Sequence, residues 1–103
     1  MAGRFYGSER WERKRRYILA RDGYQCQVSK RYGRLLQADT VHHIFPLEIF
    51  PQYKLSDWNL ISINHSVHDQ LHDRTTHRLT EKGKDLLRRT ARKYGIEYDE
   101  SDL

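Results

Sequence analysis

The chain has 103 residues, of which 37% are hydrophobic and 32% charged, so it has room for one domain around a small core. Its single cysteine excludes a disulfide within the chain, and the absence of a long apolar run excludes a membrane span. The net charge is +5, and residues 1–34 hold ten Lys or Arg against three Asp or Glu, a local balance of +7. This balance favours a nucleic acid as partner, although a solvated basic surface explains it equally well.

The first predicted element is a basic N-terminal helix within residues 1–22. Ser8 can cap a helix that runs to about Ala20, and the turn signal Asp22-Gly23 ends it. If the partner is a nucleic acid, we expect four residues of this helix to contact its phosphates. They are Arg13, Lys14, Arg15 and Arg16.

The middle of the chain, residues 24–73, alternates between extended and turn-forming segments. The pattern predicts two short strands, 24–28 and 34–38, and a third, 40–45, that stops at Pro46 because proline cannot continue a ladder. A loop to Ser56 and a turn at 57–59 then lead into a brief strand, 60–63. Asn64 can cap a helix over 65–73.

The last helix is predicted over residues 80–94, where Leu86, Leu87, Ala91 and Tyr94 form an apolar stripe. The segment 95–103 is an acidic tail, and we expect it to be mobile. The expected fold class is therefore α+β, with a strand, loop, strand and helix at its centre and a helix on either side. With no secretory signal near the N-terminus, we expect a cytoplasmic protein.

Two pairs of histidines lie in this central unit. His68 and His72 are four residues apart on a predicted helix, so their rings share one face and can bind one transition-metal ion. His42 and His43 are neighbours on a strand and must point to opposite sides. One of them can therefore bind a metal while the other acts as a general base, the division that phosphodiester hydrolysis requires. Each pair taken alone equally suits solvated side chains.

Three segments in this order resemble the HNH nuclease family, and they read VHHIFP (41–46), DWNLISI (57–63) and HSVHDQLH (65–72). The flanking Trp11, Arg15, Leu19, Arg21-Asp22 and Cys26-Gln27 resemble the region that precedes this motif in small phage members, so the match runs from about Tyr6 to His72. The resemblance implies a ββα-metal (His-Me finger) core within one nuclease domain spanning residues 1–103.

The resemblance also implies a role for each matching residue. His43 takes the place of the general base that activates water, and Asn59 takes that of the asparagine that braces the loop and orients the base. His42 stands where many members have Asp, and a histidine at this position resembles the colicin DNase version of the motif. The resemblance makes His42 a metal ligand together with His68 and His72. Three imidazoles favour Zn²⁺, Ni²⁺, Co²⁺ or Mn²⁺, whereas Mg²⁺ prefers oxygen ligands.

One departure concerns a second metal. Many phage members hold a structural zinc with two Cys-x-x-Cys pairs, and the matching positions here are Cys26 with Ser29 and Asn64 with Val67. Because one thiol of four is present, we expect no structural four-Cys zinc and one divalent ion per chain.

The function implied is a metal-dependent DNA endonuclease that nicks or cuts duplex DNA, as a monomer or weak dimer, in a bacterial or phage-infected cell. Similarity to phage members implies a role in genome packaging beside the terminase. The alternative is a non-catalytic, zinc-stabilised DNA-binding module, which would keep the three ligands and would not need His43 and Asn59 together. A protein that used only its basic surface would not explain the spacing of the histidines.

Overall fold

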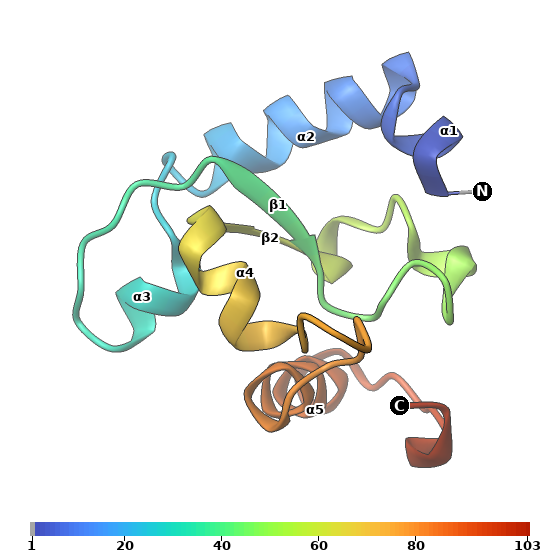
Figure 1. Cartoon of the computed structure of the whole chain (residues 1–103). Helices are drawn as coiled ribbons and strands as arrows, with labels where there is room; N and C mark the ends of the chain where they lie inside the picture. The colour runs from blue at the N-terminus through green and yellow to red at the C-terminus, as the bar shows by residue number, and fades with distance from the viewer. Residues whose placement is uncertain (1) are drawn as a thin grey trace.

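The computed structural model describes residues 2–103, and its centre is the predicted unit of two strands followed by a helix (Figure 1). Strands β1 (Thr40–His43) and β2 (Leu60–Ile63) pair antiparallel, with His42 opposite Ile61 and His43 opposite Leu60. Helix α4 (His65–Leu71) follows directly and is capped by the Asn64 side chain, as predicted. The two strands are joined by a loop that contains the 3-10 turns η1 (Pro51–Tyr53) and η2 (Asp57–Asn59).

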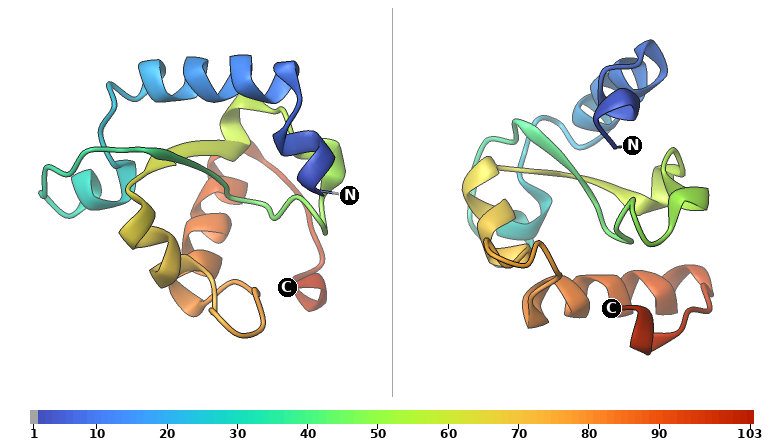
Figure 2. Two further views of the ribbon diagram at one scale, coloured as in Figure 1. Left: turned by 45° about the horizontal axis from the view of Figure 1, so that its top comes forward. Right: turned by 45° about the vertical axis from the view of Figure 1, so that its right-hand side comes forward.

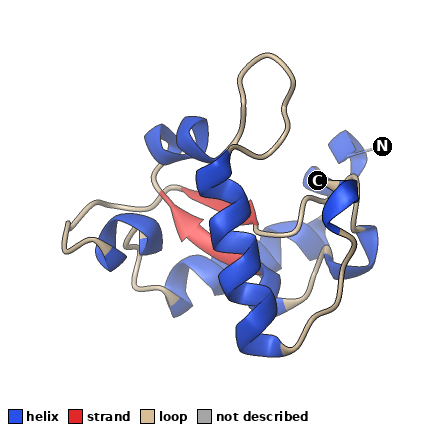
Figure 3. Ribbon diagram, turned by 90° about the horizontal axis from the view of Figure 1, so that it is seen from below, coloured by secondary structure: helices blue, strands red, loops and turns tan. Residues whose placement is uncertain are grey.

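Helices cover this unit on both sides. Helix α2 (Glu9–Arg21) begins at the predicted cap Ser8, whose side chain accepts the Trp11 N–H, and it packs on both strands. Helix α5 (Glu81–Tyr94) packs against α4 at the opposite side of the molecule from α2 (Figure 2), and in the view from below it lies in front of the strands (Figure 3). Thr80 caps α5, and Gly95 ends it in a left-handed conformation with φ 66°.

The core has two parts, one on either side of the strand pair. Trp11, Ile18 and Leu19 of α2 pack with Ala38, Val41 and Leu60. The larger part joins the inner faces of α4 and α5 to the loop around Phe45 and Phe50. No helix in residues 2–103 combines the length and the apolar character needed to cross a membrane.

The predicted strand pair at 24–28 and 34–38 is wrong. The two segments meet only at an isolated bridge between Gln25 and Gln37. Tyr24 has φ 58°, a left-handed conformation that cannot begin a strand, and residues Gln27–Arg31 form the helix α3. Residues 24–28 have β propensity but do not form a strand, because helix α3 buries Val28 in the larger part of the core.

Both ends of the chain also differ from the prediction. The helix expected from Ser8 to about Ala20 is present as α2, but Ala2–Tyr6 form an additional helix, α1, which the sequence did not predict. The tail expected to be mobile is packed, with Ile96 and Tyr98 against the core and Leu103 only 9% exposed. Glu100 in the 3-10 turn η3 (Glu100–Asp102) also pairs with Arg88 at 2.6 Å. These apolar anchors are spaced among acidic residues, which hid them in the sequence.

Candidate functional site

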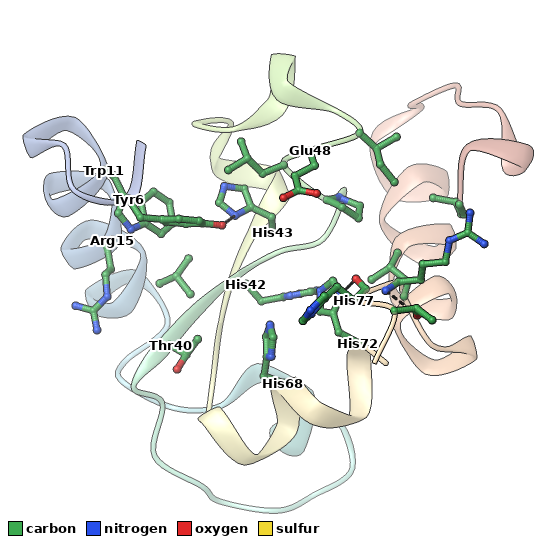
Figure 4. Close-up of a pocket in the computed structure, with 18 of the residues that line it drawn as sticks. Tyr6, Trp11, Arg15, Thr40, His42, His43, Glu48, His68, His72 and His77 are labelled. Atoms are coloured by element: carbon green, nitrogen blue, oxygen red, sulfur yellow. Dashed lines mark hydrogen bonds between the residues drawn. The ribbon is translucent and has the colours of Figure 1, made fainter. Parts of the chain in front are cut away.

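Three histidines from two neighbouring elements converge at one point (Figure 4). Each of His42, His68 and His72 offers a ring nitrogen, and these nitrogens all lie within 4.8 Å of one another. His42 comes from β1 and His68 from α4. His72 was expected within the helix, but it is the C-cap residue with an extended backbone, and its ring still stacks on that of His68 with 4.9 Å between centroids.

The buried nitrogen of His42 indicates what this cluster can hold. His42 is 3% exposed, and its Nε2 is the one buried side-chain nitrogen or oxygen within residues 2–103 that has no hydrogen-bond partner. Burial, followed by the charges of His72 and His68, lowers the pKa of His42 well below its ordinary value, so the ring is neutral. A buried polar nitrogen without a partner is costly unless something binds it. Together with two more imidazoles, it fits a divalent transition-metal ion.

His43 points to the other side of β1, as strand alternation predicts. Its ring stacks on Trp11 with 5.1 Å between centroids and 21° between planes, and its Nε2 lies 3.0 Å from the carbonyl oxygen of Lys54. A carbonyl can only accept a hydrogen bond, so Nε2 carries the proton and Nδ1 keeps its lone pair. Burial lowers the pKa of His43, which the Lys54 hydrogen bond partly opposes. A neutral ring with a free Nδ1 is the form that a general base needs.

Tyr6 is a site residue that the sequence did not reveal. Its hydroxyl lies 3.4 Å from Nδ1 of His43, and its ring is one of three aromatic groups around that histidine, with Phe5 and Trp11. Burial, followed by the negative charge of Glu48, raises the pKa of Tyr6, so the hydroxyl is protonated and donates to Nδ1. No local pattern connects residues 37 positions apart, because the contact depends on how α1 folds back beside α2.

Asn59 is fully buried and joins two parts of the loop between the strands. Its Oδ1 accepts the N–H of Phe45 at 2.6 Å, and its Nδ2 donates to the carbonyls of Phe45 and Tyr53 at 3.2 and 3.1 Å. The next carbonyl, that of Lys54, accepts the hydrogen bond from His43. Asn59 is therefore connected to His43 through the loop and not by a direct side-chain contact.

The four basic residues expected to contact phosphates point in different directions, because successive residues of a helix are about 100° apart. Arg15 lies on the side of the histidines and donates to the Asp39 carbonyl. Lys14 pairs with Asp57 at 2.5 Å, while Arg13 and Arg16 form exposed pairs with acidic residues one turn before them, Glu9 and Glu12. Of the four, Arg15 is the residue that the fold places at the candidate site.

All four site histidines line one cleft of about 880 Å³. Tyr6, Arg15 and Trp11 lie on one side of the cleft and His77 on the other, and Glu48 lies near His43 (Figure 4). Arg78, the residue after His77, also lines the cleft. Sequence reasoning missed Glu48 and Arg78 because each is a single charged residue in a loop. His65 lies apart from the cluster, and its Nδ1 forms a 2.6 Å hydrogen bond with the Asp39 carboxylate, which lowers the pKa of that carboxyl.

Cys26 and Val67, two of the positions that match the family's structural zinc, are both buried in the larger part of the core. The Cys26 thiol is fully buried, as expected, and Ser29 Oγ lies 3.3 Å from its sulfur. Apolar packing between Cys26 and Val67 in this part of the core joins the two segments, and the Ser29–Cys26 hydrogen bond lies within the first of them.

No family model matches the chain, and no curated protein matches it. A search of solved structures finds the HNH endonuclease of the deep-sea thermophilic bacteriophage GVE2, crystallised with a manganese ion. The two chains are 31% identical, the match covers 84% of each chain, and the TM-score is 0.66. The order of strand, strand and helix, the histidine cluster and this similarity agree, and the chain belongs to the HNH endonuclease family.

Proposed function

We propose that the protein is a metal-dependent DNA endonuclease in which His42, His68 and His72 hold one divalent ion and His43 is the general base. The observation that carries the proposal is the division of two adjacent histidines between the two faces of β1. One joins a three-imidazole cluster, and the other keeps a lone pair on Nδ1 in the same cleft. A DNA-binding module would need only the first.

The chain's own residues explain how water would be activated. The Lys54 carbonyl fixes the proton on Nε2 of His43, Trp11 holds the ring by stacking, and Nδ1 takes the proton from an attacking water molecule. Asn59 holds the segment that carries the Lys54 carbonyl. A divalent ion bound by the three histidines supplies Lewis-acid stabilisation of the scissile phosphate and of the leaving oxygen.

Arg15 and Arg78 both line the cleft and supply positive charge for the DNA backbone beside the histidines. Arg13, Lys14 and Arg16 add to the field of the basic helix, which attracts DNA without reading its sequence. We propose Mn²⁺ as the first ion to test, because the GVE2 enzyme was crystallised with manganese, followed by Ni²⁺, Co²⁺, Zn²⁺ and Mg²⁺.

One site cuts one strand, so a monomer nicks DNA and a double-strand break requires two events. The bacteriophage source of the similar structure supports a phage role in the host cytoplasm. From the family resemblance, we also propose a role in phage genome packaging beside the terminase.

The proposal is tested by nicking of supercoiled plasmid across the five ions. We expect relaxed circles to appear with at least one ion, and chelation by EDTA to stop their formation. A variant His68→Ala removes one of three ligands, so we expect loss of both nicking and metal binding. Titration of the wild type should show about one ion per chain.

Two results would contradict this assignment. Tight DNA binding without nicking in any ion would favour the non-catalytic, zinc-stabilised module. A second tightly held zinc in pure protein would contradict the expectation of one ion per chain. The exposed His65→Ala is the matched control, because it removes an imidazole from outside the cluster and should leave metal binding unchanged.

A further expected result concerns Tyr6. Its hydroxyl occupies Nδ1 of His43, so an attacking water molecule has to displace it. A hydrogen bond is worth about 1 kcal/mol net, so Tyr6→Phe is expected to raise the single-turnover nicking rate about two- to five-fold. Tyr17→Phe, which changes an exposed tyrosine of α2, is the control. A large decrease for Tyr6→Phe would show instead that the hydroxyl takes part in catalysis.

A further inference from the structure

The loop between α4 and α5 makes a direct contact with the candidate metal site. Nδ1 of His72 lies 3.1 Å from the carbonyl oxygen of His77, and the two residues lie side by side in the cleft (Figure 4). Because the carbonyl can only accept, Nδ1 of His72 carries the proton. The lone pair is then on Nε2, which leaves that nitrogen as the ligand atom. Hydrogen bonds of this kind commonly orient histidine ligands and set their tautomer.

The carbonyl of His77 is held in place by the closure of the loop and not by the core. His77 is exposed and has φ 61°, a left-handed conformation that non-glycine residues adopt rarely. Its N–H donates to the Asp73 carbonyl at 2.8 Å, and the Asp73 N–H donates to the Arg78 carbonyl at 2.7 Å. The loop is therefore closed by two backbone hydrogen bonds, one from the N–H and one to the carbonyl of Asp73.

The side chain of Asp73 completes the closure. Its Oδ1 accepts the N–H groups of Thr75 and Thr76, both at 2.8 Å, which turns the backbone toward His77. Beyond the loop, a bridge between His72 and the buried Leu79 returns the chain to the core. One exposed carboxylate thus helps to set the path of a six-residue loop that contacts the cluster at His72.

We propose that Asp73 is a positioning residue for the metal ligand His72, because it closes the 73–78 loop and so places the His77 carbonyl against Nδ1. The proposal rests on the proposed metal site. It assigns a function to a surface loop that carries no ligand of its own. It also explains how His72 can act as a ligand from the extended C-cap position, where no helix fixes its side chain.

The test is a calorimetric titration in which Mn²⁺ alone is added to the metal-free protein. We expect Asp73→Ala to weaken binding about ten-fold, within the range usual for partners of metal ligands. Asp73→Asn keeps an oxygen that accepts the same two N–H groups, so it should stay within about two-fold of the wild type. Asp69→Ala removes an equal charge from α4 and should also stay within about two-fold.

Two outcomes of the titration would overturn the proposal. One is wild-type affinity in Asp73→Ala. The other is an equal loss in Asp69→Ala, which would assign the effect to charge instead of loop closure. If the wild type binds neither Mn²⁺ nor any of the other four ions, the proposed function fails, and the tautomer of His72 in the metal-free protein still tests the role of the loop.

Long-range proton–nitrogen NMR of the metal-free protein reads the tautomer of His72 directly. We expect the Nδ1-protonated form in the wild type and in Asp73→Asn, and a mixture with the Nε2-protonated form in Asp73→Ala. The Nε2-protonated form in the wild type would overturn the proposal even if Asp73→Ala failed to fold.

Discussion

Replacing His43 by alanine is expected to lower the nicking rate about 100- to 10,000-fold, the usual contribution of a general base. The His43 ring keeps a lone pair on Nδ1, because the Lys54 carbonyl holds the proton on Nε2. His43 points away from the three-histidine cluster, so Mn²⁺ affinity should change little. Single-turnover nicking of plasmid together with a Mn²⁺ titration measures both quantities.

A general base is identified by a variant that loses nicking activity and keeps its Mn²⁺ affinity. His42→Ala, one residue earlier on the same strand, should lose metal binding and nicking together. Nicking by His43→Ala at the wild-type rate would remove His43 from the mechanism, and equal loss of metal affinity in both variants would place it among the ligands. His65→Ala, outside both groups, should leave the rate within about two-fold.

Asn59→Ala is expected to destabilise the protein by about 2–4 kcal/mol, a large part of the stability of a small domain. The substitution removes three hydrogen bonds inside a fully buried site and leaves the N–H and carbonyl of Phe45 and the carbonyl of Tyr53 without their partner. Urea unfolding of the metal-free protein, monitored by tryptophan fluorescence, measures the free energy of unfolding.

Asn64→Ala provides the matched control. It removes a helix cap and a hydrogen bond to Gln37 at a less buried position, so it should cost about 1 kcal/mol. If Asn59→Ala cost no more than this control, the buried brace would be unimportant for stability. In the folded fraction of Asn59→Ala we also expect slower nicking, because the Lys54 carbonyl loses the support that holds it against His43.

The regions that sequence analysis predicted correctly have local causes. Ser8, Asn64 and Thr80 accept backbone N–H groups at the start of α2, α4 and α5, and these caps act within three residues. The split of His42 and His43 follows from the two-residue period of a strand. The strand 60–63 is apolar enough to be buried whatever surrounds it.

The regions that were predicted wrongly depend on contacts between segments that are distant in the sequence. Tyr24–Ala38 has the composition of two strands, but a left-handed residue and a short helix replace them because Val28 is buried from α3. The tail looked mobile because its apolar residues are spaced among acids, and only contact with the core shows that Leu103 is buried.

At the site, the sequence by itself determined which residues have the right chemistry: four histidines, an asparagine and a basic helix. Only the tertiary structure decided how they act, because the deciding groups are backbone atoms and distant side chains. The Lys54 and His77 carbonyls, which fix the tautomers of His43 and His72, are present in any sequence, and the fold alone places them. The contact of Tyr6 with His43 and the selection of Arg15 from four basic neighbours arise in the same way, from packing between segments far apart in the chain.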